Sequence, residues 1–198
     1  MRWNPIEQIQ DIANKFGTEE RIKRFQSGEL VLVERNPTIA EPVLRFERNA
    51  RYAGGKFVTK QSFTRDNAKV KFGYIDERVS KLFGNVKEDV PAGELAVHTL
   101  MCGTHDPEIM VALGPQAKRF TKLGQFYVAL ESQGLGQEGS LLVNGYANIA
   151  YIPDENGAAW AVSASWNNQF YGGWGVRVGS VASRSEWDAG GQVISQVV

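Results

Sequence analysis

The sequence predicts a mainly β protein, an antiparallel sandwich, jelly roll or barrel with a short N-terminal helical arm. Two patterns support this class. Apolar and polar residues alternate with a period of two in several short segments, as they do in half-buried strands. Turn dipeptides such as Gly54-Gly55 and Asn156-Gly157 separate these segments. Many short strands joined by turns favour a sandwich or barrel over a parallel sheet with crossover helices.

The arm comprises residues 1–28 and precedes a β domain at 29–198. Asn4 can cap a first helix, Pro5 suits its first position, and Gly17 is a natural stop. A second short helix is expected from Glu19 to Gln26. Helices this short are marginal in water, so the apolar face of the arm is expected to dock on a neighbour. The residues expected to make that contact are Trp3, Ile6, Ile9 and Phe16.

The β domain is expected to hold about ten strands, a number within the range of common sandwiches and barrels. The segments with strand character are Leu30–Glu34, Val43–Arg48, Lys56–Phe63, Ala68–Tyr74, Leu95–Met101, Ile109–Leu113, Gln125–Glu131, Leu141–Val143, Tyr146–Ile152, Trp160–Trp166, Trp174–Val178 and Gln192–Val197.

Composition restricts the class of protein further. A chain of 198 residues can bury a large core without disulfides or metals, and its single cysteine, Cys102, excludes an intrachain disulfide. No apolar run approaches the roughly 20 residues that a membrane span needs. The N-terminus turns polar too early for a signal peptide. We therefore expect a protein made in the cytoplasm that has no membrane partner.

Charge is distributed unevenly although the net charge is zero. Through Val90 the chain has 17 Lys and Arg against 13 Asp and Glu, and from Pro91 onward it has 5 against 9. Aromatic residues are interleaved with bases between Val43 and Ile75, a combination that single-stranded nucleic-acid binders use for phosphates and bases. The residues expected to bind nucleic acid are Arg45, Arg48, Arg51, Lys56, Phe57, Lys60, Lys69 and Lys71. The alternative interpretation is a core of aromatics beneath a solvated face.

The segment from His98 to Asp106 holds both histidines and the only cysteine. Cys102 with two histidines could bind zinc on a helix, and a Cys102–His105 pair could activate a thiolate. The threonines, Gly103 and Pro107 instead favour a strand followed by a turn, which does not bring the three side chains together. We therefore predict no metal site, no cofactor and no catalytic residue.

The C-terminal part is rich in glycine and tryptophan. Trp160, Trp166 and Trp174 are expected to point inward because they alternate with small residues, whereas Trp187 is expected to be exposed. Aromatic, Asn and Gln residues near turns could also form a sugar-binding platform. A carbohydrate-binding module is therefore one alternative function.

The function that the sequence favours is a non-enzymatic assembly subunit that binds other copies of itself or other structural proteins. The amphipathic arm and the opposite charge bias of the two halves suit head-to-tail contacts. The composition, a β body rich in glycine and tryptophan with an amphipathic arm, is typical of bacteriophage virion components in a capsid, decoration or tail. Incorporation into a virion is therefore expected. Single-stranded nucleic-acid binding by residues 45–74 is the second hypothesis, from a different class.

Overall fold

The computed structural model describes residues 42–170 and 172–197, and these residues are mostly β. The predicted arm at residues 1–28 and the strand at Leu30–Glu34 lie outside the described residues. The strands are β1 (Leu44–Tyr52), β2 (Gly55–Val58), β3 (Phe72–Ile75), β4 (Lys87–Val90), β5 (Gly93–Leu100), β6 (Asn148–Pro153), β7 (Ala159–Asn167), β8 (Gly173–Ser180) and β9 (Gln192–Gln196). The helices are α3 (Thr59–Ser62), α4 (Glu77–Phe83), α5 (Asp106–Leu113), α6 (Gln116–Arg119) and α7 (Leu123–Glu131).

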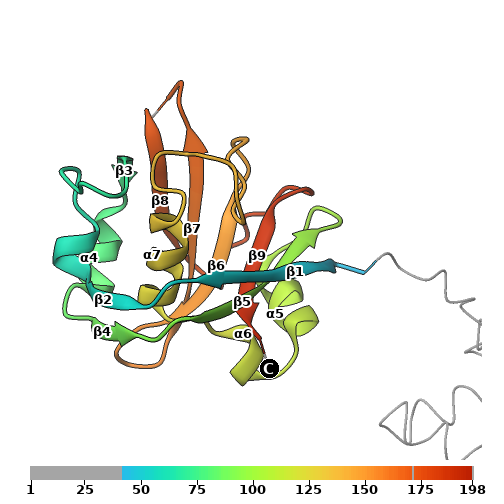
Figure 1. Cartoon of the computed structure of the whole chain (residues 1–198). Coiled ribbons are helices and arrows are strands. Elements are labelled where there is room, and N and C mark those ends of the chain that lie inside the picture. Colours follow the sequence, from blue (N-terminus) through green and yellow to red (C-terminus); the bar gives the residue numbers. More distant parts are fainter. Residues whose placement is uncertain (1–41, 171, 198) are drawn as a thin grey trace, which may run out of the picture. The chain divides into compact units, whose positions relative to one another are not determined.

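One sheet of seven strands dominates the fold, in the order β1-β5-β9-β6-β7-β8-β3 (Figure 1). A second sheet contains only β2 and β4. The large sheet is mixed, because β3 pairs with β8 and β6 pairs with β9 in parallel, whereas the other pairs are antiparallel. Neither sheet closes on itself. The expectation of a purely antiparallel sheet is therefore wrong, and the structure does not confirm a sandwich, jelly roll or barrel.

The strands of the large sheet change direction from one edge to the other. In Figure 1, β1 and β5 run across the view, whereas β7 and β8 run upward. Right-handed twist between neighbouring strands accumulates in this way across a wide sheet. Helix α7 packs against one face of the sheet, and seven of its residues are buried, including Phe126 and Leu130.

The two faces of the sheet carry separate apolar clusters. Alternation along β6 places Ala150 and Ile152 in the cluster around α7, and Ile149 and Tyr151 in the cluster around α5. Side chains of successive strand residues point to opposite faces, so burial on both faces makes the strand continuously apolar. The β core therefore has a helical layer on each side.

Two predicted strands are helices instead. Ile109–Leu113 belongs to α5 and Gln125–Glu131 to α7. Both segments are short and apolar, and such runs fit a buried helix as well as a strand. Two further predictions are too long, because Lys56–Phe63 becomes strand only to Val58 and Ala68–Tyr74 only from Phe72. Leu141–Val143 has no strand structure.

Membrane insertion through a helix is not supported. No helix of the described ranges combines the length and the apolar character that a span requires.

Candidate functional site

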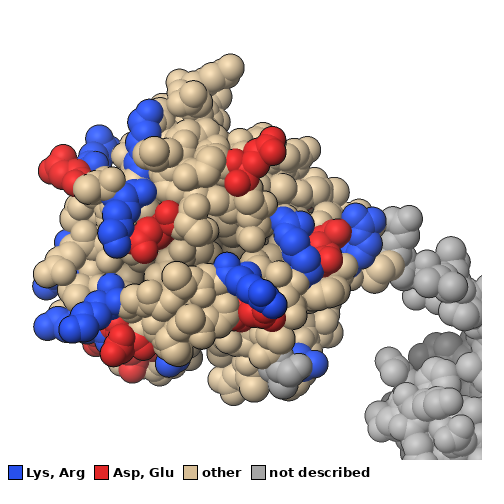
Figure 2. All heavy atoms as spheres, viewed as in Figure 1, with Lys and Arg blue, Asp and Glu red and all other residues tan. Residues whose placement is uncertain are grey.

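The predicted basic residues lie on several elements. Three arginines are on β1, Lys56 is on β2, Lys60 is in α3, and Lys69 and Lys71 precede β3. Acidic side chains neutralise several of them: the nitrogen–oxygen distances are 2.9 Å for Arg45–Glu47 and 2.8 Å for both Arg51–Glu94 and Lys69–Glu131. Figure 2 accordingly shows Lys and Arg interspersed with Asp and Glu on the visible face. Nucleic-acid binding by these residues stays a prediction.

The aromatic part of that prediction needs correction. Phe57 is 1% exposed, and its ring centroid lies 6.1 Å from Phe63 and 5.4 Å from Tyr127. A base cannot stack on a ring that is enclosed by the core, so the role predicted for Phe57 is wrong. Phe46 is the exposed ring of this stretch, at 57% exposure.

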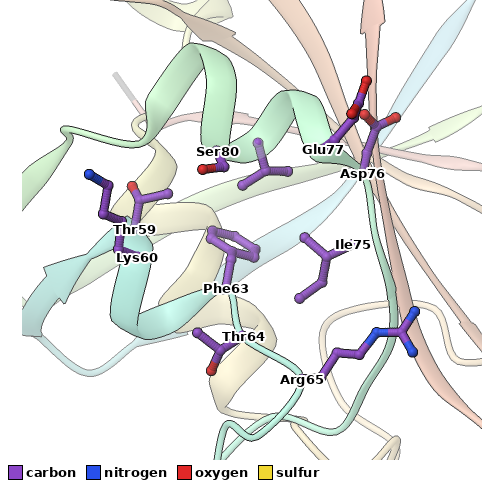
Figure 3. A pocket seen from close by; sticks show the side chains of 10 residues that line it. Thr59, Lys60, Phe63, Thr64, Arg65, Ile75, Asp76, Glu77 and Ser80 are labelled. Carbon is purple, nitrogen blue, oxygen red and sulfur yellow. The ribbon is translucent and has the colours of Figure 1, made fainter.

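Lys60 and Arg65 border a pocket of about 340 Å³ beside α3 and α4. Figure 3 shows the Phe63 ring near the middle of the view, with Lys60 to its left, Arg65 to its lower right, and Asp76 and Glu77 to its upper right. The Asp76 carboxylate is engaged by Arg78, whose Nε and Nη2 donate to it over 2.9 and 2.6 Å. The pocket therefore offers cations and acids in similar number and favours no charged ligand.

The His98–Asp106 segment is the end of β5 and the turn into α5. His98 Nε2 lies 3.0 Å from Ser195 Oγ on β9, whereas His105 Nδ1 lies 3.2 Å from the carbonyl oxygen of Ser185. The two histidines therefore contact different parts of the molecule, and Cys102 is a free, half-buried thiol. Residues 42–170 and 172–197 contain no group of three His, Cys, Asp or Glu side chains arranged to hold a metal.

The tryptophans follow the prediction in part. Trp174 is fully buried, and its indole donates to the carbonyl oxygen of Gln133 over 2.9 Å. Trp160 and Trp166 pack against the same core and are half-buried. Trp187 is half-buried as well, contrary to the expected exposure, because its Nε1 donates to the buried carboxylate of Asp106 over 2.8 Å. All four rings thus pack against one of the two apolar clusters, and carbohydrate binding stays a prediction.

The predicted oligomer contacts Trp3, Ile6, Ile9 and Phe16 lie outside the described residues. The described chain begins immediately before β1, which forms one edge of the large sheet. Within residues 42–170 and 172–197, strand β1 pairs with β5 only, and its residues 45–49 are all exposed. The outer backbone groups of such a strand are unpaired and can accept another chain.

A groove of about 360 Å³ lies beside this edge strand, between β1, β5, β9, α5 and α6. Phe46 and Val197 line it and are 57% and 42% exposed. His98 forms part of the wall: its ring centroid lies 5.7 Å from that of Phe46, and burial lowers its pKa. Lys118 adds a single cation. The groove therefore presents a mixed lining, in which the exposed apolar side chains of Phe46 and Val197 lie beside polar groups.

The register of β1 explains how the edge is arranged. Arg45 and Arg48 are opposite Thr99 and Val97, which share one face of β5, whereas Arg51 is opposite Glu94 on the other face. A bulge between Phe46 and Arg48 adds one residue and keeps both Arg45 and Arg48 on the same side. Bulges and charged side chains discourage indiscriminate pairing at a sheet edge.

Comparison with known proteins adds no functional assignment: no family model, curated protein or solved structure matches the chain.

The sequence did not predict the groove, although Val43–Arg48 was predicted as a strand. The groove joins residues from five elements, most of which are far apart in sequence. The only local signal was Phe46 within a charged segment, which is unusual for a solvated strand.

Proposed function

We propose that this protein is a non-enzymatic assembly subunit in which the N-terminal arm of one copy binds the β1 edge and adjoining groove of the next copy. The observation that carries the proposal is the position of β1. Within the described residues it is an edge strand of nine residues, and it lies beside a groove that contains the exposed Phe46 and Val197. Residues 29–43 separate it from the arm, whose sequence predicts an amphipathic helix. A virion as the destination stays a prediction.

A head-to-tail contact fits the charges better than pairing of β1 with itself. Antiparallel self-pairing centred on Arg48 would place Arg45 opposite Arg51, and like charges opposite each other destabilise a sheet. The predicted arm helix carries Glu7 and Asp11, which complement the arginines of β1. A heterologous contact of this kind builds rings or filaments.

The test uses two defective full-length chains. Ile6→Asp with Ile9→Asp disables the apolar face of the arm, and Phe46→Asp disables the groove. Sedimentation should show that the wild type assembles while each variant stays monomeric. Mixing the two variants should restore a dimer, because one chain supplies an intact arm and the other an intact groove.

Phe170→Asp is the matched control. Phe170 is 80% exposed in the turn between β7 and β8, so its substitution should leave assembly unchanged. A wild-type chain that sediments as a monomer at high concentration, or a mixture that fails to form the dimer, would overturn the proposal.

A further inference from the structure

A second cavity, of about 650 Å³, lies over β7 and β8 on the face of the sheet that α5 covers. Three small residues form much of its floor, namely Ala161 and Ser163 of β7 and Gly179 of β8. Ala161 is in register with Gly179, and Ser163 is in register with Arg177, which also lines the cavity. Because of the small side chains, the sheet surface is open here, with the segment after β8 forming a wall that includes Trp187.

Ser163 is a polar side chain without a partner. It is 6% exposed and lines the cavity, and within the described part of the chain its hydroxyl makes no hydrogen bond. Among the described residues, the Ser163 hydroxyl is not one of the side-chain atoms that are buried without a hydrogen bond, so it is open to the cavity. The hydroxyl is therefore available to donate to a ligand or accept from it.

Two guanidinium groups border the same cavity. Arg78 is held in place by the Asp76 carboxylate, which accepts from its Nε and Nη2, so the guanidinium is oriented before any ligand arrives. Arg177 lies with its guanidinium carbon 5.4 Å from the centre of the Tyr74 ring. Arginine presents several N–H donors in a fixed fork that suits oxyanions, phosphate in particular.

Asp106 provides an acceptor in the same cavity. It is 3% exposed, and both Tyr151 and Trp187 donate to its Oδ1, each over 2.8 Å. Its second oxygen is therefore left to accept from a ligand hydroxyl. The half-buried Trp187 indole beside it offers an apolar ring face.

We propose that this cavity binds a small phosphorylated compound that carries hydroxyl groups, such as a sugar phosphate. Arg78, Arg177 and the Ser163 hydroxyl hold the phosphate, and Asp106 with Trp187 receives the hydroxyl-bearing part. The volume exceeds that of a phosphate ion alone and lies within the usual range of small-molecule sites. This site is separate from the β1 edge, so it does not depend on the assembly proposal.

The test measures binding of ribose 5-phosphate to the full chain by calorimetry, with ribose as the ligand control. Ribose 5-phosphate should bind and ribose should not. Arg177→Gln and Ser163→Ala should each weaken binding about tenfold or more, corresponding to a loss of about 1.4 kcal/mol. Arg184→Gln removes a charge from the same segment after β8 but outside the cavity, and it should leave binding unchanged.

Two variants separate ligand binding from a structural role. Ser163→Ala removes an unpaired hydroxyl, so it should not lower the thermal stability of the unliganded protein. Gly179→Val should block the cavity without a backbone clash, because an added Cβ there meets only the Ala161 carbonyl oxygen, at 3.9 Å. Absence of ribose 5-phosphate binding at millimolar concentration, or unchanged binding to the Gly179→Val variant, would overturn the proposal.

Discussion

Tyr151 donates a hydrogen bond to Oδ1 of Asp106 over 2.8 Å, and this contact joins β6 to the first turn of α5. Trp187 donates to the same oxygen, so one carboxylate connects three segments that are far apart in the chain. The backbone of Trp187 also pairs with Thr104, over 2.8 and 3.1 Å, which holds the segment after β8 against the turn that precedes α5. Asp106 is therefore a central polar contact of the face that carries the second cavity.

Tyr151→Phe should lower the free energy of unfolding by about 1–3 kcal/mol, because it removes a buried hydrogen bond to a carboxylate without removing the ring. Urea unfolding measures the change. Tyr146→Phe is the control, since Tyr146 is exposed and should give almost no change. Equal stability of the two variants would show that the Tyr151–Asp106 contact contributes nothing.

Asp106→Asn should change how stability depends on pH. Burial raises the pKa of Asp106 above its ordinary value, so the native state binds this proton more tightly than the unfolded chain. The native state therefore loses stability as the pH rises from the ordinary pKa of aspartate through the raised pKa of Asp106. The loss persists at neutral pH. The Asn variant lacks this titration, so its stability relative to the wild type should increase over that pH range.

Asp154→Asn should behave in the opposite way and serves as the control. The hydrogen bond from the Trp160 indole lowers the pKa of Asp154, so its carboxylate stabilises the native state above the ordinary pKa. Stability of this variant relative to the wild type should fall as the pH rises from the lowered pKa to the ordinary value. Thermal melts of the wild type and both variants from acidic to neutral pH measure the two trends. If the stability of both variants relative to the wild type changed in the same direction with pH, the opposite pKa shifts of Asp106 and Asp154 would be contradicted.

Arg78→Gln should weaken the start of α4. The Asp76 carboxylate caps this helix by accepting from the backbone N–H of Arg78 over 2.9 Å, and the Arg78 guanidinium holds the pKa of Asp76 below its ordinary value. A lowered carboxyl pKa contributes stability that is lost as the pH falls through it. Removing the guanidinium should raise the pKa of Asp76, so NMR titration of its carboxyl carbon should show a higher midpoint.

The same Arg78→Gln variant should lose about 1 kcal/mol at neutral pH, since Arg78 is half exposed and solvent screens the pair. Lys81→Gln is the control, because its pair with Glu77 lies on the helix surface and should contribute about 0.3–0.5 kcal/mol. Equal losses for the two variants, with no change in the pKa of Asp76, would contradict the stabilising role of the Arg78 guanidinium.

Phe57→Ala should lower the free energy of unfolding by about 3–5 kcal/mol, as expected when a large ring is removed from a packed core. Phe46→Ala should stay within about 0.5 kcal/mol because Phe46 is mainly exposed. Urea unfolding of both variants at low protein concentration measures the stability of the single chain. A Phe57→Ala variant as stable as the wild type would contradict the core position of this ring.

The alternation of residue types along the sequence predicted those strands in which successive side chains differ in size or polarity. Trp160–Trp166 and Trp174–Val178 alternate with a period of two, and both segments lie within strands of the large sheet. The same reasoning failed for Gln125–Glu131, because α7 is buried on nearly all sides and so has no polar stripe that would reveal a helical period. The start of α5 had a usable signal, since Asp106 and Pro107 suit the first turn of a helix.

By itself, the sequence determined the mainly β class, the position of most strands and the charge bias along the chain. Each of these features depends on residues that are near one another in the chain. Hydrophobic periodicity indicates the strands, and the residue types give the charge bias directly. Only the tertiary structure decided the mixed strand order, the exposed groove at β1 and the cavity beside Asp106. These features bring together side chains as distant as Asp106 and Trp187, and the energy of such a contact depends on burial and distance, which no local pattern records.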